Sequence, residues 1–292
     1  MKRSILPGFA AALFAVLSLH VAHAAEAPPP VAAEQIAPGL YLVTGGGGAN
    51  SSILVGPDGA LVVDAKLDIA SAEAELAVLD GLHDGELRYL INTHVHPDHT
   101  GGNEAFGKAG ATIISRDETR AILAAGQRGG PPAPAAALPT LTFPNGQLTL
   151  LINGETVVIR EVPAAHTTDN SIVHFVNANV FHMGDVFQAT RYPLAAGGTY
   201  QGFVDAADAV LALANEQSKF IPGNGALEDI SALRAFRDML VDVQGKVAAL
   251  VKEGKTADEI AAAKPTAAYD ATYGDPSRMI PGLVQELSAA GR

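Results

Sequence analysis

The chain has 292 residues, a hydrophobic content of 48% and a formal net charge of −12. The acidic balance disfavours nucleic acid and anionic membrane surfaces as partners, because both bind clusters of lysine and arginine. The sequence contains no cysteine, which excludes disulfides and thiolate chemistry, so any metal must be held by nitrogen and oxygen atoms.

The N-terminus has the pattern of a secretory signal peptide over residues 1–24. Lys2 and Arg3 precede an apolar segment that runs from Ile5 to Val21, and small residues at positions 22 and 24 suit cleavage after Ala24. The apolar segment is shorter than the roughly 20 residues that a membrane span needs. Cleavage would remove two cations and no acid, which changes the net charge from −12 to −14. The sequence therefore predicts a periplasmic or secreted protein.

The rest of the chain is predicted to form one domain. Residues 25–36, with three consecutive prolines at 28–30, are interpreted as an extended leader. Residues 37–292 are long enough to bury one large core, and α/β folds of this size are often single domains. The Pro- and Ala-rich residues 129–139 are predicted to be a loop without regular structure.

Predicted strands and helices alternate along this domain, with turn residues between them. Predicted strands cover 40–44, 51–55, 61–64, 87–93, 111–115, 148–152, 156–162, 171–176, 179–183 and 219–221. Predicted helices cover 69–82, a short segment after Gly102, 116–125, 203–215, 229–252 and a segment after Thr256. Two β-rich halves that each end in helices favour an αββα sandwich of the α/β (α+β) class, with two sheets packed face to face and helices outside.

A metal-binding motif follows the predicted strand 87–93. The segment from His94 to His99 reads His-Val-His-Pro-Asp-His, which places three imidazoles and a carboxylate within six residues. These are the groups that bind zinc and similar ions, and a turn at a strand end can make such side chains converge. Pro97 and the glycines at 101–102 support a shaped turn there.

Three further positions at strand ends are candidates to complete the site. His166 lies in a loop between two predicted strands, and Asp185 follows the strand 179–183. A carboxylate at the end of an apolar strand is costly to bury without a cation. Asn224 lies in the sequence Pro-Gly-Asn-Gly, where the strand 219–221 ends in a turn.

Together these motifs resemble the metallo-β-lactamase fold superfamily over about residues 37–240. The resemblance is carried by the His-x-His-x-Asp-His motif, by His166 before Thr-Thr-Asp-Asn, by Gly-Asp at 184–185 and by Pro-Gly-x-Gly around Asn224. It implies that His94, His96 and His166 bind a first metal, that Asp98 and His99 bind a second, and that Asp185 bridges them. The family usually has histidine where this chain has Asn224, so we expect weaker binding of the second metal.

Other polar side chains are given supporting or structural roles. Asp64, at the end of a predicted strand, is expected to accept a hydrogen bond from a ligand imidazole. His182 should point to the opposite face of its strand from Asp185, so His182 and His174 are interpreted as structural. Four cations that could attract an anionic substrate, Lys66, Arg116, Arg128 and Arg191, are interpreted as solvated surface residues.

The resemblance implies a zinc-dependent hydrolase with a small-molecule substrate. Zinc lowers the pKa of bound water from about 15.7 to roughly 7, and the resulting hydroxide would attack a carbonyl carbon, with Asp98 orienting it and relaying a proton. The absence of cysteine excludes members with a Cys ligand, and the Asp98–His99 pair resembles both the lactamases with His and Asp ligands and the glyoxalase II-like thioesterases.

Predicted export favours an amide, lactone or ester substrate over a thioester. The alternatives that remain are a glyoxalase II-like thioesterase and a protein that holds one metal with little or no turnover. The pocket walls are expected in residues 45–50, 129–139 and 191–200.

Overall fold

Residues 30–290 are described by a computed structural model. The predicted signal peptide and residues 25–29 of the predicted leader lie outside these residues. Within the described part of the chain, no helix is both long and apolar enough to cross a membrane.

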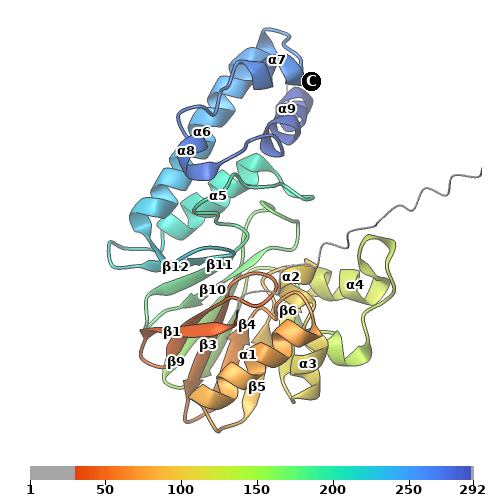
Figure 1. Cartoon of the computed structure of the whole chain (residues 1–292), viewed down its shortest axis with the longest axis vertical. Helices are drawn as coiled ribbons and strands as arrows, with labels where there is room; N and C mark the ends of the chain where they lie inside the picture. The colour runs from red at the N-terminus through yellow and green to blue at the C-terminus, as the bar shows by residue number, and fades with distance from the viewer. Residues whose placement is uncertain (1–29, 291–292) are drawn as a thin grey trace, which may run out of the picture.

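Two sheets lie face to face at the centre of the molecule (Figure 1). The first sheet has seven strands in sequence order, and its first four strands are antiparallel while β4 to β7 run parallel. Its strands are β1 (Ala32–Ala37), β2 (Leu40–Thr44), β3 (Ser51–Gly56), β4 (Gly59–Val63), β5 (Leu87–Ile91), β6 (Thr112–Arg116) and β7 (Leu141–Phe143).

The second sheet has six strands in the order β13-β12-β11-β10-β9-β8, with a parallel pairing only between β11 and β12. Its strands are β8 (Gln147–Ile152), β9 (Glu155–Glu161), β10 (Ser171–Phe175), β11 (Val180–Gly184), β12 (Lys219–Pro222) and β13 (Glu228–Asp229). Asn153 and Gly154, which join β8 to β9, have φ angles of 56° and 74°, as a tight two-residue hairpin turn requires.

Helices cover the outer faces of both sheets. The first half contains α1 (Ile69–Leu82), α2 (Pro97–Thr100), α3 (Asn103–Lys108) and α4 (Asp117–Ala125), and the second half contains α5 (Tyr200–Leu211), α6 (Ile230–Lys252), α7 (Ala257–Ala262), α8 (Asp270–Tyr273) and α9 (Met279–Ala290). Asp68 and Asp229 cap α1 and α6 through side-chain oxygens, and Thr256 forms a capping box with Glu259 at the start of α7.

The alternation of buried residues along the strands produces three apolar layers. On β4, Leu61 and Val63 face the core between the sheets, whereas Val62 faces α1 and α3. On β11, Val180 faces the same central core, whereas Phe181 and Met183 pack against α5 and α6. This arrangement confirms the predicted αββα sandwich.

The structure differs from the sequence prediction at several elements. Ala32–Ala37, mostly assigned to the leader, forms the edge strand β1, which pairs with β2. Two short 3-10 turns, Gln127–Gly129 and Ala135–Ala137, interrupt the region predicted as an irregular loop. Strand β7 and helices α8 and α9 were not predicted at all. The C-terminal helices form a group beside α5 at the top of Figure 1.

Candidate metal centre

The candidate ligands lie on loops at the ends of central strands. His94 and His96 follow β5, and Asp98 and His99 begin the short helix α2. In the second sheet, His166 lies between β9 and β10, and Asp185 directly follows β11. The structure thus brings together six of the seven predicted site residues; the seventh, Asn224, is considered below.

The turn after the histidine motif packs tightly against the segment that follows β4. A Cβ atom on Gly101 would lie 1.8 Å from the Leu67 carbonyl oxygen, and one on Gly102 would lie 2.1 Å from the Ala65 carbonyl oxygen. Only glycine fits such an approach between two backbones. The side-chain amide of Asn92 donates to the His99 carbonyl at 3.2 Å from within this turn. The shape of the motif is therefore fixed by backbone contacts.

The first group of candidate ligand atoms comes from His94, His96 and His166, each of which offers one ring nitrogen within 4.8 Å of the others. Nδ1 of His96 is 2.8 Å from Nε2 of His166. Nδ1 of His166 donates to the Leu194 carbonyl at 2.7 Å, so in the neutral ring Nε2 keeps its lone pair. Nε2 of His94 is buried without a hydrogen-bond partner. Three imidazole nitrogens thus converge as a zinc site requires.

The second group comes from His94, His99 and Asp185. Nε2 of His99 lies 3.5 Å from Oδ1 of Asp185 and 3.6 Å from Oδ2 of Asp98. The other oxygen of Asp185, Oδ2, lies 3.4 Å from Nε2 of His166. Asp185 therefore directs one carboxylate oxygen towards each group.

The electrostatics of the second group also suit a cation. Although burial disfavours charge on Asp185, the imidazoles of His99, His94 and His166 hold its pKa well below the usual range. Burial likewise opposes charge on His99, but the carboxylates of Asp64 and Asp185 raise its pKa well above the usual range. A divalent ion can take the place of that proton as the compensating positive charge.

Buried polar atoms without partners test whether a metal fits. Nε2 of His94, Nε2 of His99 and Oδ1 of Asp185 are all buried and make no hydrogen bond. Leaving such atoms unsatisfied is costly, and all three belong to the second group. Nitrogen and carboxylate oxygen are donors that zinc accepts. The residues present therefore fit a divalent metal.

Asp64 contacts the second group through His99. Its Oδ1 accepts from the Thr93 backbone N–H at 2.8 Å, and its Oδ2 lies 2.7 Å from Nδ1 of His99. The φ angle of Asp64 is 64°, a left-handed conformation that is uncommon for residues other than glycine and typical of strained functional positions. The predicted interaction between a carboxylate and a ligand imidazole is present.

His182 lies closer to the candidate metal centre than the sequence predicted. It is fully buried on β11, with Nδ1 3.1 Å from Oγ of Ser52 and Nε2 3.5 Å from Oδ2 of Asp64. It belongs to neither group of converging ligand atoms. The alternation on β11 predicted that it would face away from Asp185, but it could not show that Asp64 would lie against that face.

Asn224 lies in the turn that follows β12, and this turn is anchored by backbone contacts. The side-chain amide of Asn50 donates to the carbonyls of Pro222 and Gly225 at 3.0 and 2.9 Å, and Gly223 N–H donates to Gly184 O at 2.7 Å. Asn224 itself is half-buried and does not line the cavity described next. Its assignment as a ligand stays a prediction.

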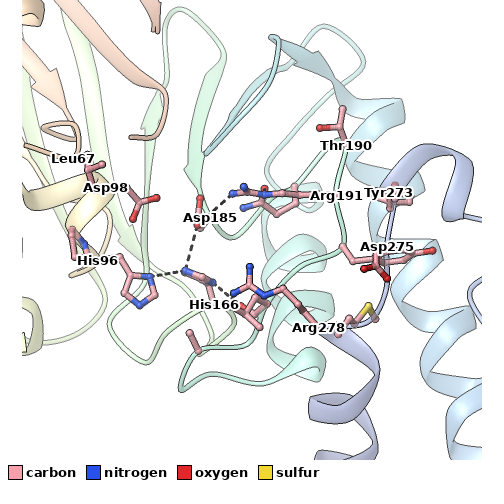
Figure 2. Close-up of a pocket in the computed structure, with 17 residues that line it drawn as sticks. Leu67, His96, Asp98, His166, Asp185, Thr190, Arg191, Tyr273, Asp275 and Arg278 are labelled. Atoms are coloured by element: carbon pink, nitrogen blue, oxygen red, sulfur yellow. Dashed lines mark hydrogen bonds and ion pairs between the residues drawn. The ribbon is translucent and has the colours of Figure 1, made fainter. Parts of the chain in front are cut away.

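A cavity of about 640 Å³ opens onto the candidate ligands. His96, Asp98, His166 and Asp185 line one side (Figure 2). Of the predicted walls, the segment from Arg191 to Ala196 contributes residues, whereas 129–139 does not. Residues 45–50 do not line the cavity either. They contact the segment that carries Asp98, because Ala49 N–H donates to the Asp98 carbonyl at 3.1 Å.

The opposite wall was not predicted. It consists of Tyr273, Gly274, Asp275, Arg278 and Met279, from the end of α8 and the start of α9. No local pattern marked these residues, because their role depends on how the C-terminal helices pack against the loop after β11.

Two of the four cations predicted to be solvated are in fact buried. Lys66 is fully buried, and its Nζ donates to the carbonyls of Val43 and Ala49 at 3.3 and 2.9 Å. Arg116 is also buried and donates to the Thr168 carbonyl at 2.9 Å, which holds the loop that carries His166. These two residues have structural roles, and among the three whose exposure is described only Arg191 reaches the cavity.

Comparison with known proteins agrees with this geometry. Residues 44–231, more than half of the chain, match the metallo-β-lactamase superfamily. The chain therefore belongs to this superfamily, whose members are typically metal-dependent hydrolases.

Solved structures show the same fold at low sequence identity. A metallo-β-lactamase from Pontibacter korlensis is 19% identical with a TM-score of 0.63, and the alignment covers 73% of this chain and 99% of that one. The metallo-β-lactamase DIM-1 is 18% identical with a TM-score of 0.61, covering 73% and 98%. TMB-1 gives the same values as DIM-1. No curated protein matches the chain.

Proposed function

We propose that this protein is an exported, zinc-dependent hydrolase that acts on the carbonyl group of a small molecule, with a β-lactamase-like preference for amide, lactone or ester bonds. The observation that carries the proposal is the set of buried, unpartnered ligand atoms of His94, His99 and Asp185, the last of which lines an open cavity. Their geometry supports His94, His96 and His166 as ligands of one ion, Asp98 and His99 as ligands of a second, and Asp185 between them. Export rests on the signal peptide pattern.

The metal ion and the side chains would contribute different parts of the proposed hydrolysis. A bound divalent ion would polarise a carbonyl and supply a nucleophilic water at neutral pH. Asp98 can orient that water and accept its proton, because its side chain is 36% exposed and lines the cavity. His99 stays fixed by Asp64 during this step.

The test combines metal content with turnover. Mature protein is loaded with zinc, its metal content is measured by mass spectrometry, and it is assayed on a chromogenic cephalosporin, a lactone and a thioester. Hydrolysis of the cephalosporin or the lactone supports the proposal, and preferential hydrolysis of the thioester would move the protein to the glyoxalase II-like class. Fully metallated protein that hydrolyses none of them would overturn the enzyme assignment in favour of metal binding alone.

A further inference from the structure

The loop that joins β2 to β3 begins with four consecutive glycines and passes beside Asp98. It covers residues 45–50, and three of its glycines have positive φ angles of 77°, 67° and 103°. A Cβ atom on Gly48 would lie 2.7 Å from the Asp98 carbonyl oxygen and 2.7 Å from the Leu67 backbone nitrogen. The glycines therefore permit a close approach to Asp98, but glycine has the greatest backbone freedom and cannot by itself hold the loop there.

Hydrogen bonds connect this loop to both halves of the candidate centre. Ala49 N–H donates to the Asp98 carbonyl at 3.1 Å, and Asn50 N–H donates to the Gly223 carbonyl at 2.8 Å. Asp98 lies at the end of the first sheet, whereas Gly223 lies in the turn after β12 of the second sheet. A shift of the loop would therefore disturb the segment that carries Asp98.

Lys66 joins the two ends of the loop from inside the protein. Its side chain is fully buried, and Nζ donates to the Val43 carbonyl at 3.3 Å and to the Ala49 carbonyl at 2.9 Å. The φ angle of Lys66 is 63°, in the left-handed region where residues other than glycine are uncommon. Such a conformation persists only where the surrounding contacts impose it, so both the backbone and the ammonium group of Lys66 are tightly constrained.

An ion pair alone does not account for this buried lysine. Burial lowers the pKa of Lys66, and Glu75, also fully buried, opposes that shift. Burial in turn raises the pKa of Glu75 to about 7, so its charge compensates that of Lys66 only in part. Buried ion pairs are often no more stabilising than apolar side chains of similar volume. What the ammonium group supplies, and an apolar side chain would not, is the connection between the two ends of the loop.

We propose that Lys66, in addition to its structural role in the core, is a positioning residue that fixes residues 45–50 and thereby holds Asp98 in place at the second group. The connection has two steps, from Lys66 to Ala49 and from Ala49 to Asp98. This inference rests on the proposed function, in which Asp98 binds the second metal ion and orients the attacking water. Loss of the ammonium group should therefore weaken second-site metal binding in a protein that remains folded.

The first variant is Lys66→Met, which keeps most of the side-chain volume and removes the ammonium group. In metal-free protein, amide hydrogen exchange over residues 45–50 should become about 10- to 100-fold faster, because two charge-assisted hydrogen bonds are lost. Affinity for the second zinc ion, titrated against a chromogenic chelator, should fall about tenfold, while first-site affinity is unchanged. Lys108→Met, which removes an exposed ammonium group on α3, is the matched control.

A double variant separates positioning from stability. Lys66→Met leaves Glu75 without its compensating charge, whereas Lys66→Met combined with Glu75→Gln removes both charges. Thermal stability should therefore recover in the double variant, while exchange stays fast and second-site affinity stays low. If exchange and affinity recover together with stability, Lys66 acts only through the stability of the core and the inference fails. Unchanged exchange in Lys66→Met, or unchanged affinity despite faster exchange, would also overturn it.

Turnover adds a readout that depends on the proposed function. If wild type hydrolyses the chromogenic cephalosporin, both Lys66 variants should lower kcat about 10- to 100-fold at saturating zinc and change KM by less than about threefold, because the cavity wall is unaltered. Wild type that hydrolyses none of the three substrates would remove the proposed function. Exchange and zinc affinity would still decide the role of Lys66, because neither measurement requires turnover.

Discussion

The two groups of candidate ligands are supported in different ways. In the first group, the outer nitrogen of His166 donates to a neutral backbone carbonyl, and that of His94 lies 3.2 Å from the Thr93 hydroxyl. In the second group, His99 is bound by the buried carboxylate of Asp64. A carboxylate partner makes an imidazole a stronger metal ligand than a neutral partner does.

This difference bears on the prediction that the second site lacks one nitrogen ligand. The first group has three imidazoles, whereas the sequence resemblance predicts Asn224 at the second site in place of a histidine. Around the second group, however, the negative charges of Asp64, Asp98 and Asp185 all lie close to His99. We infer that metal affinity at the first site depends on the number of nitrogen ligands, whereas metal affinity at the second site depends on the nearby negative charge. Each site should therefore respond to a different substitution.

The largest expected effect is loss of the first site in His96→Ala. Removing one of three imidazoles should lower first-site affinity by more than about 100-fold, which exceeds the usual cost of losing only an outer hydrogen-bond partner. Zinc content after dialysis, measured by mass spectrometry, and the rate of hydrolysis should fall together. His174→Ala is the control, because His174 stacks on Phe181 at 3.9 Å and belongs to neither group. Unchanged zinc content in His96→Ala would exclude this residue as a ligand.

An intermediate effect is expected from Asp64→Asn, which keeps the shape of the side chain but removes its charge. Affinity for the second metal should fall about 10- to 100-fold, while the first site changes little. Titration against a chromogenic chelator resolves the two sites. The control is Asp80→Asn, which removes an exposed charge on α1, and thermal melting checks that the fold is intact. Equal losses at both sites would mean that Asp64 stabilises the whole centre and not the second site specifically.

Local sequence determined which parts of this centre could be predicted. The candidate ligands from His94 to His99 are close together in sequence, and His166 and Asp185 follow recognisable strands, so the motif and the strand pattern predicted that these side chains would converge. The period-two alternation on β4 and β11 also made the two-sheet architecture predictable, because each face of these strands is buried in a different layer.

Features that depend on contacts between distant residues could not be predicted. Lys66 is buried because two backbone carbonyls and Glu75 compensate its charge, which overrides the usual exposure of lysine. Strand β1 was missed because it is an exposed edge strand without clear alternation. The wall that carries Arg278 was missed because its position depends on hydrogen bonds to Tyr192 and Tyr200, which are far away in sequence.

The smallest expected effect, and the most direct test of the comparison, comes from Asn224→His. If the second site lacks one nitrogen ligand and relies on charge, restoring an imidazole should raise its metal affinity by about tenfold, or about 1.4 kcal/mol, without changing the first site. Asn224→Gln is the matched control, since it extends the side chain but keeps the poorer amide oxygen. The double variant with Asp64→Asn sharpens the test: the added imidazole should recover part of the affinity that the lost carboxylate removed. Second-site affinity that is the same in all Asn224 variants would show that this turn does not reach the metal, and that charge around His99 alone holds the second ion.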